Sequence, residues 1–189
     1  MKVQKVLKSY IFLALVAGAI IALDQWSKSI IRAEFTGPEG MQMWAPWDWL
    51  VPYARIVHVT NTGVAFGMFQ GMWMIFAVLA GLVALAIIYY FPQVPEEDRV
   101  LRVSMSMMLA GALGNLIDRL TNDGRVTDFV SLGNFPVFNV ADASITIGVV
   151  ILLLGMLVQE YRQKQKKETE DHLQIVLDNE AQSPDQRVE

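Results

Sequence analysis

The sequence has no cysteine, only two histidines and few charged side chains. Charged residues make up 18% of its 189 residues, and 19 Asp and Glu outnumber 15 Lys and Arg. The lack of cysteine excludes disulfide frameworks, thiol nucleophiles and zinc–thiolate sites. Two histidines, one of them in a charged tail, are too few for a multi-histidine metal site and make a Ser/His/Asp triad unattractive. A net charge of -4 gives no basic excess for nucleic-acid binding. We therefore expect no metal, no cofactor and no nucleic-acid partner.

Apolar residues are abundant instead, and they are concentrated in long runs. Hydrophobic side chains make up 53% of the sequence, above the roughly 45–50% of soluble proteins. Four runs approach the length of about 20 residues that a membrane-spanning helix needs. They cover residues 10–31, 72–91, 100–119 and 140–160 approximately. The sequence predicts a polytopic, all-α membrane protein whose single membrane-embedded domain covers residues 1–167, followed by a polar, charged tail at 168–189.

The first apolar run has an alternative interpretation as a cleaved signal peptide. Lys2, Lys5 and Lys8 precede it, as basic residues precede the apolar core of a signal peptide. The one triplet suited to cleavage, residues 17–19, lies inside the run rather than after it. We therefore expect a retained span.

Lys and Arg are more frequent beside the span ends that lie on the same side of the membrane as the two termini, which predicts that both termini are cytoplasmic. Two stretches then lie outside, at residues 32–71 and 118–139. Each contains a β-branched or aromatic run, at residues 53–59 and 125–130, that predicts a short strand. The residue types that settle at a membrane interface also gather there: Trp44, Trp47, Trp49 and Tyr53. We expect a small sheet on the outer membrane surface.

Most of the ionisable and amide side chains of the spans fall on one side of the membrane. Because successive spans cross the membrane in opposite directions, all members of this group are expected in the outer leaflet. Its members are Asp24 and Lys28 of the first span, Asn115, Asp118 and Arg119 of the third, and Asp142 of the fourth. Gly111 and Gly114 are expected to let neighbouring helices approach closely here. Asp24 and Lys28 have the spacing of an intrahelical ion pair.

Carboxylates dominate the chemistry available on the outer side, where Asp24, Asp118, Asp128 and Asp142 are expected. Two carboxylates held close together cannot both ionise, so one keeps a proton and acts as the acid while the other is the base. Such a pair can hydrolyse a peptide bond with water and without a metal. Asp128, in an apolar strand-like segment, and Asp142, at the entrance to a span, are the best candidates for this pair.

Structural interpretations compete with these assignments. Asp142 could be the N-cap of the last span, and Asp118 could form an ion pair with its neighbour Arg119. His58, in an alternating strand, is expected at a surface or an interface. Asn61, followed by Thr62 and Gly63, is typical of a turn.

Most of the polar residues discussed above fall in five short motifs. They are Asp24-Gln25-Trp26-Ser27-Lys28, Asn61-Thr62-Gly63-Val64-Ala65-Phe66-Gly67, Gly111-Ala112-Leu113-Gly114-Asn115-Leu116-Ile117-Asp118-Arg119, Val126-Thr127-Asp128-Phe129 and Phe138-Asn139-Val140-Ala141-Asp142. In their order and spacing these motifs resemble the bacterial prolipoprotein signal peptidases, the signal peptidase II family. The resemblance extends from about Lys5 to Tyr161.

The resemblance implies an aspartic endopeptidase of the bacterial inner membrane, acting at its outer leaflet. Members of the family remove the signal peptide of lipoprotein precursors by cutting just before a cysteine that carries a diacylglyceryl group, and the antibiotic globomycin inhibits them. Membrane lipid is the other expected partner. The residues carried over by motif are Asp128 and Asp142 as the catalytic dyad, Asn61, Asn115, Arg119 and Asn139 as substrate-positioning groups, and Asp24, Lys28 and Asp118 as support for the fold. The implied fold has four transmembrane helices, an extracytoplasmic β-sheet cradle and a short surface helix at residues 63–69.

Two functions of other classes remain open from the residues alone. A small proton-coupled transporter or channel would also carry Asp, Lys and Arg in its spans, but it should distribute them over the whole membrane depth. Here the inner halves of the spans are almost purely apolar, apart from Ser104 and Ser106. An inactive assembly or anchoring subunit would tolerate the loss of both Asp128 and Asp142.

Overall fold

Four long apolar helices dominate the structure, a computed structural model that describes residues 2–63 and 68–182. The helices are α1 (Lys2–Glu34), α2 (Trp73–Tyr90), α3 (Arg99–Thr121) and α4 (Val140–Gln182). Each contains a stretch of 18 residues with a mean hydropathy between 1.5 and 2.5. All four are long and apolar enough to cross a membrane. The four predicted spans are thus confirmed, and α1 and α4 extend beyond their predicted bounds.

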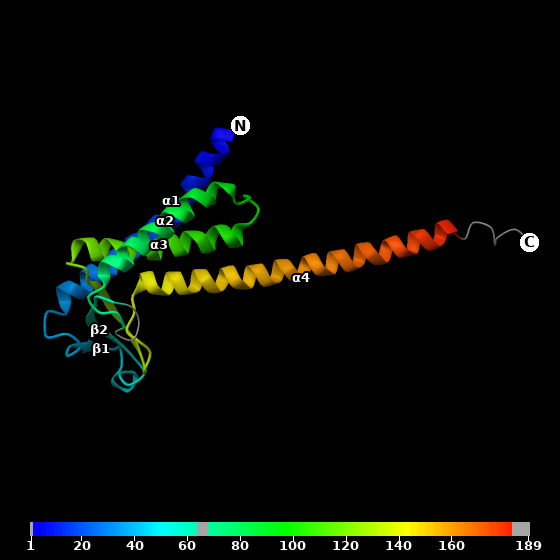
Figure 1. Cartoon of the computed structure of the whole chain (residues 1–189). Coiled ribbons are helices and arrows are strands. Elements are labelled where there is room, and N and C mark those ends of the chain that lie inside the picture. Colours follow the sequence, from blue (N-terminus) through cyan, green and yellow to red (C-terminus); the bar gives the residue numbers. More distant parts are fainter. Residues whose placement is uncertain (1, 64–67, 183–189) are drawn as a thin grey trace, which may run out of the picture. The chain divides into compact units, whose positions relative to one another are not determined.

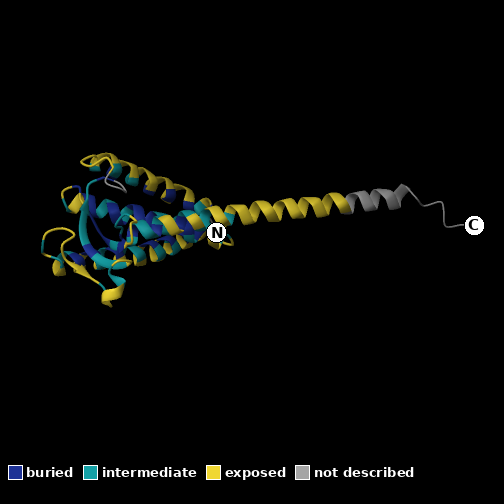
Figure 2. Ribbon diagram, turned by 90° about the horizontal axis from the view of Figure 1, so that it is seen from below, coloured by how far each residue is buried: buried dark blue, intermediate teal, exposed yellow. Residues whose placement is uncertain are grey.

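The third helix is the central one. In its apolar stretch 50% of the residues are buried, against 17–22% in the other three helices. It packs against both α1 and α2, as Figure 1 shows. On α2, by contrast, large side chains such as Leu79, Leu82 and Leu85 are exposed. Figure 2 shows exposed residues in yellow along the helices, beside buried residues in dark blue. An apolar surface of this extent is suited to lipid rather than to water.

Short connections define the ends of α2 and α3. A 3₁₀ turn, η3 (Phe91–Gln93), follows α2, and the Asp98 carboxylate caps α3 by accepting from the Leu101 N–H at 3.0 Å. After α3 the chain turns at Asp123 and Gly124, which have φ values of 51° and 81°. A Cβ at Gly124 would lie 2.3 Å from the Trp73 ring, so this turn requires glycine both for its conformation and for its packing.

A three-stranded antiparallel sheet lies at one end of the bundle of α1, α2 and α3 (Figure 1). Its order is β1 (Met43–Trp44), β2 (Ala54–Asn61) and β3 (Val126–Leu132), and a 3₁₀ turn, η1 (Asp48–Leu50), lies between β1 and β2. Asn61 pairs with Val126 and Val59 with Asp128, and the register shifts between residues 56 and 59. The two predicted strands correspond to β2 and β3. The sequence did not predict β1, whose two residues are defined only by their pairing with β2.

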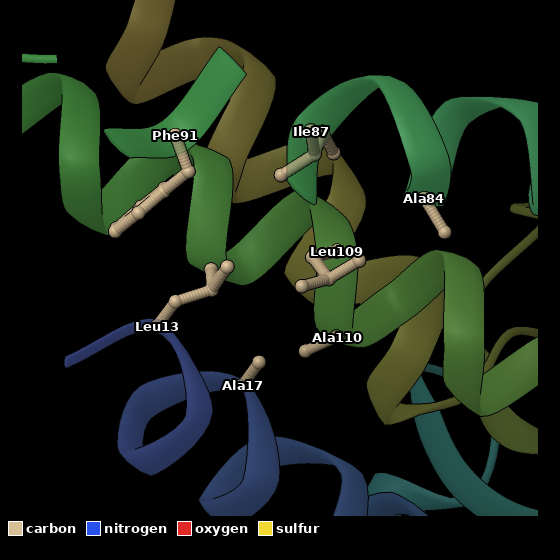
Figure 3. Close-up of a cluster of buried hydrophobic side chains, with 7 residues drawn as sticks. All are labelled: Leu13, Ala17, Ala84, Ile87, Phe91, Leu109 and Ala110. Atoms are coloured by element: carbon tan, nitrogen blue, oxygen red, sulfur yellow. The ribbon is translucent and has the colours of Figure 1, made fainter. Parts of the chain in front are cut away.

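The part of the bundle away from the sheet, which we call the far end, has a mainly apolar interior. Buried side chains from α1, α2, η3 and α3 converge there, as drawn in Figure 3. They are Leu13, Ala17, Ala84, Ile87, Phe91, Leu109 and Ala110. Arg102 lies beside this cluster with 5% of its surface exposed. Its guanidinium contacts the rings of both Phe12 and Phe91, and its Nη1 donates to Ser9 Oγ at 3.2 Å.

Two expectations are only partly covered by the structure. Residues 64–67 of the predicted surface helix lie outside the described residues, and Gly63 and Met68–Gly71 on either side form a bend and turns. The chain divides into two compact units, residues 1–151 and 152–189. All the predicted site residues belong to the first unit, and the domain boundary at residue 167 stays a prediction.

Candidate active site

A buried charge cluster holds α1 and α3 together at the end of the bundle that carries the sheet, which we call the sheet end. Asp24, Lys28 and Asp118 are completely buried. The Lys28 ammonium lies 2.9 Å from Asp24 Oδ2 and 3.3 Å from Asp118 Oδ2. Arg32, which is one third exposed, lies 3.5 Å from Asp118 Oδ1. Two cations thus balance two carboxylates, which offsets much of the cost of removing them from water.

One predicted contact in this cluster is wrong. The pair predicted along the first helix, Asp24 with Lys28, is present, but Asp118 pairs with Lys28 and Arg32 rather than with Arg119. Adjacent residues of a helix point about 100° apart, so their side chains do not face each other. The spacing of Asp24, Lys28 and Arg32 at four-residue intervals places them on one face of α1, and that signal could have identified Arg32.

The two carboxylates of the cluster also fix the backbone on either side of the site. Asp24 Oδ1 accepts from the Ala141 N–H at 2.9 Å. Asp118 Oδ2 accepts from the Thr127 N–H, also at 2.9 Å. Each therefore positions the residue directly before one of the two candidate catalytic aspartates, Asp142 and Asp128.

Glycines allow α1, α3 and α4 to come this close. A Cβ at Gly111 would lie 2.3 Å from the Ala141 carbonyl oxygen, and a Cβ at Gly114 would lie 2.7 Å from Asp24 Oδ2. Neither position can accept a side chain without displacement of its neighbours. The predicted close approach at these two glycines is confirmed.

Asp142 lies in the first turn of α4 but is not its N-cap. Asn139 is the cap: its Oδ1 accepts from the Asp142 N–H at 2.9 Å, and Asp142 Oδ2 accepts from the Asn139 N–H at 3.2 Å. This reciprocal pair is a capping box, and its three-residue spacing was already visible in the sequence. The remaining oxygen, Oδ1, accepts from Asn115 Nδ2 at 2.7 Å. The interpretation of Asp142 as the N-cap is therefore wrong, because the N-cap of α4 is Asn139, three residues earlier.

Asp128 faces the same region from β3 and is 3% exposed. Its Oδ1 accepts from Asn139 Nδ2 at 2.7 Å, and its Oδ2 accepts from Asn61 Nδ2 at 3.3 Å. Burial, reinforced by the nearby Asp142 charge, raises the pKa of Asp128 to about 7. The hydrogen bonds from Asn139 and Asn61, together with Lys28, oppose that rise only in part.

Asp128 and Asp142 line one cavity of about 580 Å³. Five of the predicted site residues reach it, and its remaining wall is largely apolar. The lining residues are Asn61, Gly63, Asn115, Arg119, Val126, Asp128, Phe135, Pro136, Val137, Phe138, Asp142, Ala143, Ile145, Thr146 and Ile147. The segment from Phe135 to Phe138, held beside β3 by the Val130–Phe138 bridge, was not identified from the sequence, since nothing in its local pattern separates it from an ordinary loop. The structure thus combines two acids with an apolar wall.

Arg119 enters the cavity from α3. Its Nη1 donates to the Asn115 carbonyl at 3.4 Å and its Nη2 to the Gly63 carbonyl at 3.3 Å, while its guanidinium lies 5.9 Å from the centre of the Phe76 ring. Its buried Nε has no acceptor among the described residues. One N–H of a fixed cation thus remains for a ligand carbonyl.

The other predicted site residues take supporting positions. Asn139 is completely buried, and its amide contacts both Asp128 and Asn115. Asn61 Oδ1 accepts from the Gly63 N–H at 2.9 Å, so the predicted turn is present and its first residue also contacts Asp128. His58 is half-buried, and its Nδ1 donates to the Phe35 carbonyl at 3.0 Å, outside the cavity lining.

Within the described part of the chain, no three His, Asp or Glu side chains are arranged so that they could hold a metal ion. The cavity therefore offers acid–base groups, amides and one guanidinium. With one proton shared between Asp128 and Asp142, these groups suit addition of water to a carbonyl carbon.

Comparison with known proteins identifies the family. The family described as signal peptidase (SPase) II matches residues 16–158. A lipoprotein signal peptidase of Halalkalibacterium halodurans is 35% identical over 81% of this chain and 96% of its own length. One of Moorella thermoacetica is 38% identical over 76% of this chain and 91% of its own. A solved bacterial membrane enzyme is 30% identical with a TM-score of 0.69, covering 78% of this chain and 88% of its own.

These similarities agree with the four apolar helices in describing a multi-pass membrane protein, and nothing in them favours a transporter. They also agree with the resemblance inferred from the five motifs. The chain belongs to the signal peptidase II family of peptidases.

Proposed function

We propose that this protein is an aspartic endopeptidase that removes the signal peptide from diacylglyceryl-modified prolipoproteins, cutting before the lipid-modified cysteine. The observation that carries the proposal is the arrangement of Asp128 and Asp142. Both line one cavity, and both accept hydrogen bonds from Asn139, one from its side chain and one from its backbone. The prolipoprotein substrate follows from the family, whose relatives are named lipoprotein signal peptidases.

The shape of the cavity supports a substrate that is part peptide and part lipid. Phe138 and Ile145 belong to its apolar wall, while Asn61 and Arg119 offer polar groups in the same cavity. An extended peptide at the membrane surface has unpaired N–H and C=O groups, and the free Nε–H of Arg119 can donate to one of its carbonyls. The acyl chains would lie along the apolar wall.

The chemistry requires a single proton shared by the two aspartates. The ionised carboxylate takes a proton from a water molecule, whose oxygen adds to the scissile carbonyl carbon. The protonated carboxyl gives its proton to the carbonyl oxygen, and the tetrahedral intermediate then collapses with protonation of the leaving nitrogen. The raised pKa of Asp128, at about 7, supports a site in which one carboxyl holds its proton near neutral pH.

The same proposal includes a bacterial inner-membrane location, cytoplasmic termini and an active site at the outer leaflet. It is supported by the excess of Lys and Arg beside the far end, where Lys5, Lys8 and Arg99 lie. Because the chain has no cysteine, single cysteines at positions 5 and 123 provide a direct test with a membrane-impermeant thiol reagent. We expect labelling of intact spheroplasts at position 123 and none at position 5, and the reverse result would invert the topology.

A cleavage assay tests the activity itself. Purified protein in detergent micelles is mixed with a diacylglyceryl-modified precursor and a metal chelator, and the product is resolved by gel shift. We expect cleavage by the wild type and a loss of at least about a thousandfold with Asp128→Asn or Asp142→Asn, since each removes one partner in proton transfer. Globomycin should block the wild-type reaction.

Asp123→Asn is the matched control, because it makes the same chemical change in an exposed turn near the site. It should cleave at the wild-type rate. Full activity of either dyad variant would contradict the aspartic mechanism. Absence of cleavage by the wild type on a modified precursor would contradict the peptidase proposal as a whole.

A further inference from the structure

The amide of Asn115 can take only one orientation in this structure. Its Oδ1 accepts two hydrogen bonds, one from Lys28 Nζ at 3.0 Å and one from Asn139 Nδ2 at 3.1 Å. Both donors exclude the reversed amide, which would place N–H groups against N–H groups. The Nδ2 of Asn115 must therefore point to Asp142 Oδ1, at 2.7 Å. Lys28 thus acts on Asp142 through one intervening amide.

The hydrogen-bond partners of Asp142 favour its ionised form. Its two oxygens accept from Asn115 Nδ2 and from the Asn139 N–H, so each oxygen faces a donor. It also lies in the first turn of α4, where the helix dipole favours a negative charge. A protonated carboxyl at this position would place its O–H against donors.

Asp128 has weaker support for a negative charge. It lies on β3, so no helix terminus stabilises it, and its second amide contact, from Asn61, is a longer one at 3.3 Å. One amide, Asn115, connects Lys28 to Asp142. Two amides, Asn115 and Asn139, separate Lys28 from Asp128. Of the two carboxyls, Asp128 is the one that can hold the proton at lower cost.

We propose that Lys28 is a positioning residue for the dyad: by fixing the Asn115 amide and placing a positive charge behind it, Lys28 keeps Asp142 as the base and leaves the proton on Asp128. This assignment rests on the proposed peptidase function and adds the roles of the two aspartates. In the first step the water proton passes to Asp142 as the new C–O bond forms, and the proton of Asp128 passes to the carbonyl oxygen. In the second step the C–N bond breaks, Asp142 returns its proton to the leaving nitrogen and Asp128 regains one from the gem-diol.

Other charged groups also face Asp142, and the test has to account for each of them. Asp24 approaches from α1, Arg119 from α3 and Asp128 from β3. Arg119 and Asp128 stay unchanged in the variants below. Asp24 differs from Lys28 in sign, so its removal should act in the opposite direction to the removal of Lys28.

The test is the pH profile of kcat/KM for precursor cleavage. Lys28→Met alone leaves Asp24 and Asp118 with too little positive charge and can fail to fold, so the main variant is Lys28→Met combined with Asp24→Asn, which keeps the buried cluster neutral. We expect the acid limb of its profile to move to higher pH by about one unit, as for loss of an opposite charge a short distance away. Below the optimum this is a loss of about tenfold.

Asp24→Asn alone is the control, since it breaks the same ion pair but keeps the Lys28 charge. Its acid limb should stay in place or move to lower pH, whatever happens to its thermal stability. A double variant whose rate falls equally at every pH, with an unmoved acid limb, would show that Lys28 has only a structural role and would overturn the inference. That outcome differs from failure of the proposed function, in which the wild type itself does not cleave.

Discussion

The two ends of the bundle are stabilised in opposite ways. At the far end, small and medium apolar side chains such as Leu13, Ala17 and Leu109 pack together, and the one buried cation beside them, Arg102, is held by aromatic rings and a hydroxyl. At the sheet end, fully buried charges meet directly, with Lys28 between Asp24 and Asp118.

This difference separates tolerant packing from precise positioning along one set of helices. Apolar packing is tolerant in detail, because many residue combinations fill the same volume. A buried ion cluster is intolerant, because each charge without its partner costs several kcal/mol. The sheet end contains such an ion cluster, and there its carboxylates fix the backbone before Asp128 and Asp142. We conclude that precise positioning is concentrated at one end of the molecule.

The largest effect on stability is expected for Asp118→Asn, which disrupts the buried ion cluster of the sheet end and leaves the far end unchanged. Lys28 then keeps only Asp24 as a carboxylate partner and Arg32 loses the carboxylate it contacts, so a destabilisation of about 3–5 kcal/mol is expected. Thermal unfolding in detergent micelles measures it, and activity should fall as well. Asp123→Asn, the same change at an exposed position, should leave the melting temperature unchanged. Equal melting temperatures for both variants would show that the cluster adds nothing to stability.

Leu109→Ala is the corresponding change at the far end, where it removes apolar packing. The side chain is 4% exposed, and its truncation should cost about 2–5 kcal/mol through lost packing and a cavity. Unlike Asp118→Asn, it should leave kcat unchanged for the protein that remains folded. Leu85→Ala, at a side chain that is 65% exposed on α2, is the control and should alter neither quantity. A fall in kcat with Leu109→Ala would mean that the two ends are coupled.

The pH dependence sharpens the comparison at the sheet end. Burial raises the pKa of Asp128 to about 7, above the roughly 3.9 of an unfolded chain. The general acid is therefore lost as pH rises through about 7, and cleavage should fall about tenfold for each further unit. Between these two pKa values the native protein keeps the Asp128 proton and the unfolded chain does not. The contribution of this proton to stability is therefore fully present below the pKa of the unfolded chain and is lost as the pH rises through the native pKa.

Melting temperatures of wild type and Asp128→Asn measured across this range test the sign of that contribution. The wild type should lose stability relative to the variant as the pH increases. A constant difference between the two would show that Asp128 does not hold a proton in the native state at neutral pH.

The smallest effect is expected beyond the bundle, at exposed tryptophans of the segment that leads into β2. Trp47 and Trp49 stack with ring centres 5.9 Å apart and are 59% and 66% exposed, as suits side chains at a membrane interface. Changing both to Ser should alter stability by about 0.5 kcal/mol or less. It should also reduce the part of the tryptophan fluorescence that interfacially brominated lipids quench, since exposed Trp44 and Trp26 remain. Unchanged quenching would place these side chains away from the lipid.

Several features of the site were predictable from the sequence because they depend on counting along the chain. The lengths of the apolar runs predicted the four helices, and the alternating direction of those helices predicted that Asp24, Asn115 and Asp142 would share one end of the bundle. The spacing of Asp24 and Lys28 predicted their ion pair. The capping box of Asn139 and Asp142 was also visible but was interpreted as a cap at the wrong residue.

Only the tertiary structure decided how these groups pair with one another. It assigned Asp118 to Lys28 and Arg32, it placed the Asn139 amide against Asp128, and it formed β1 from two residues that have no pattern of their own. The physical reason is distance along the chain: hydropathy and helical spacing act over a few residues, whereas these contacts join side chains from different elements. The sequence by itself determined the spans, the end of the bundle where the polar groups gather and the residues available for acid–base chemistry. The tertiary structure determined their partners, and with them the difference between the two aspartates on which the proposed mechanism depends.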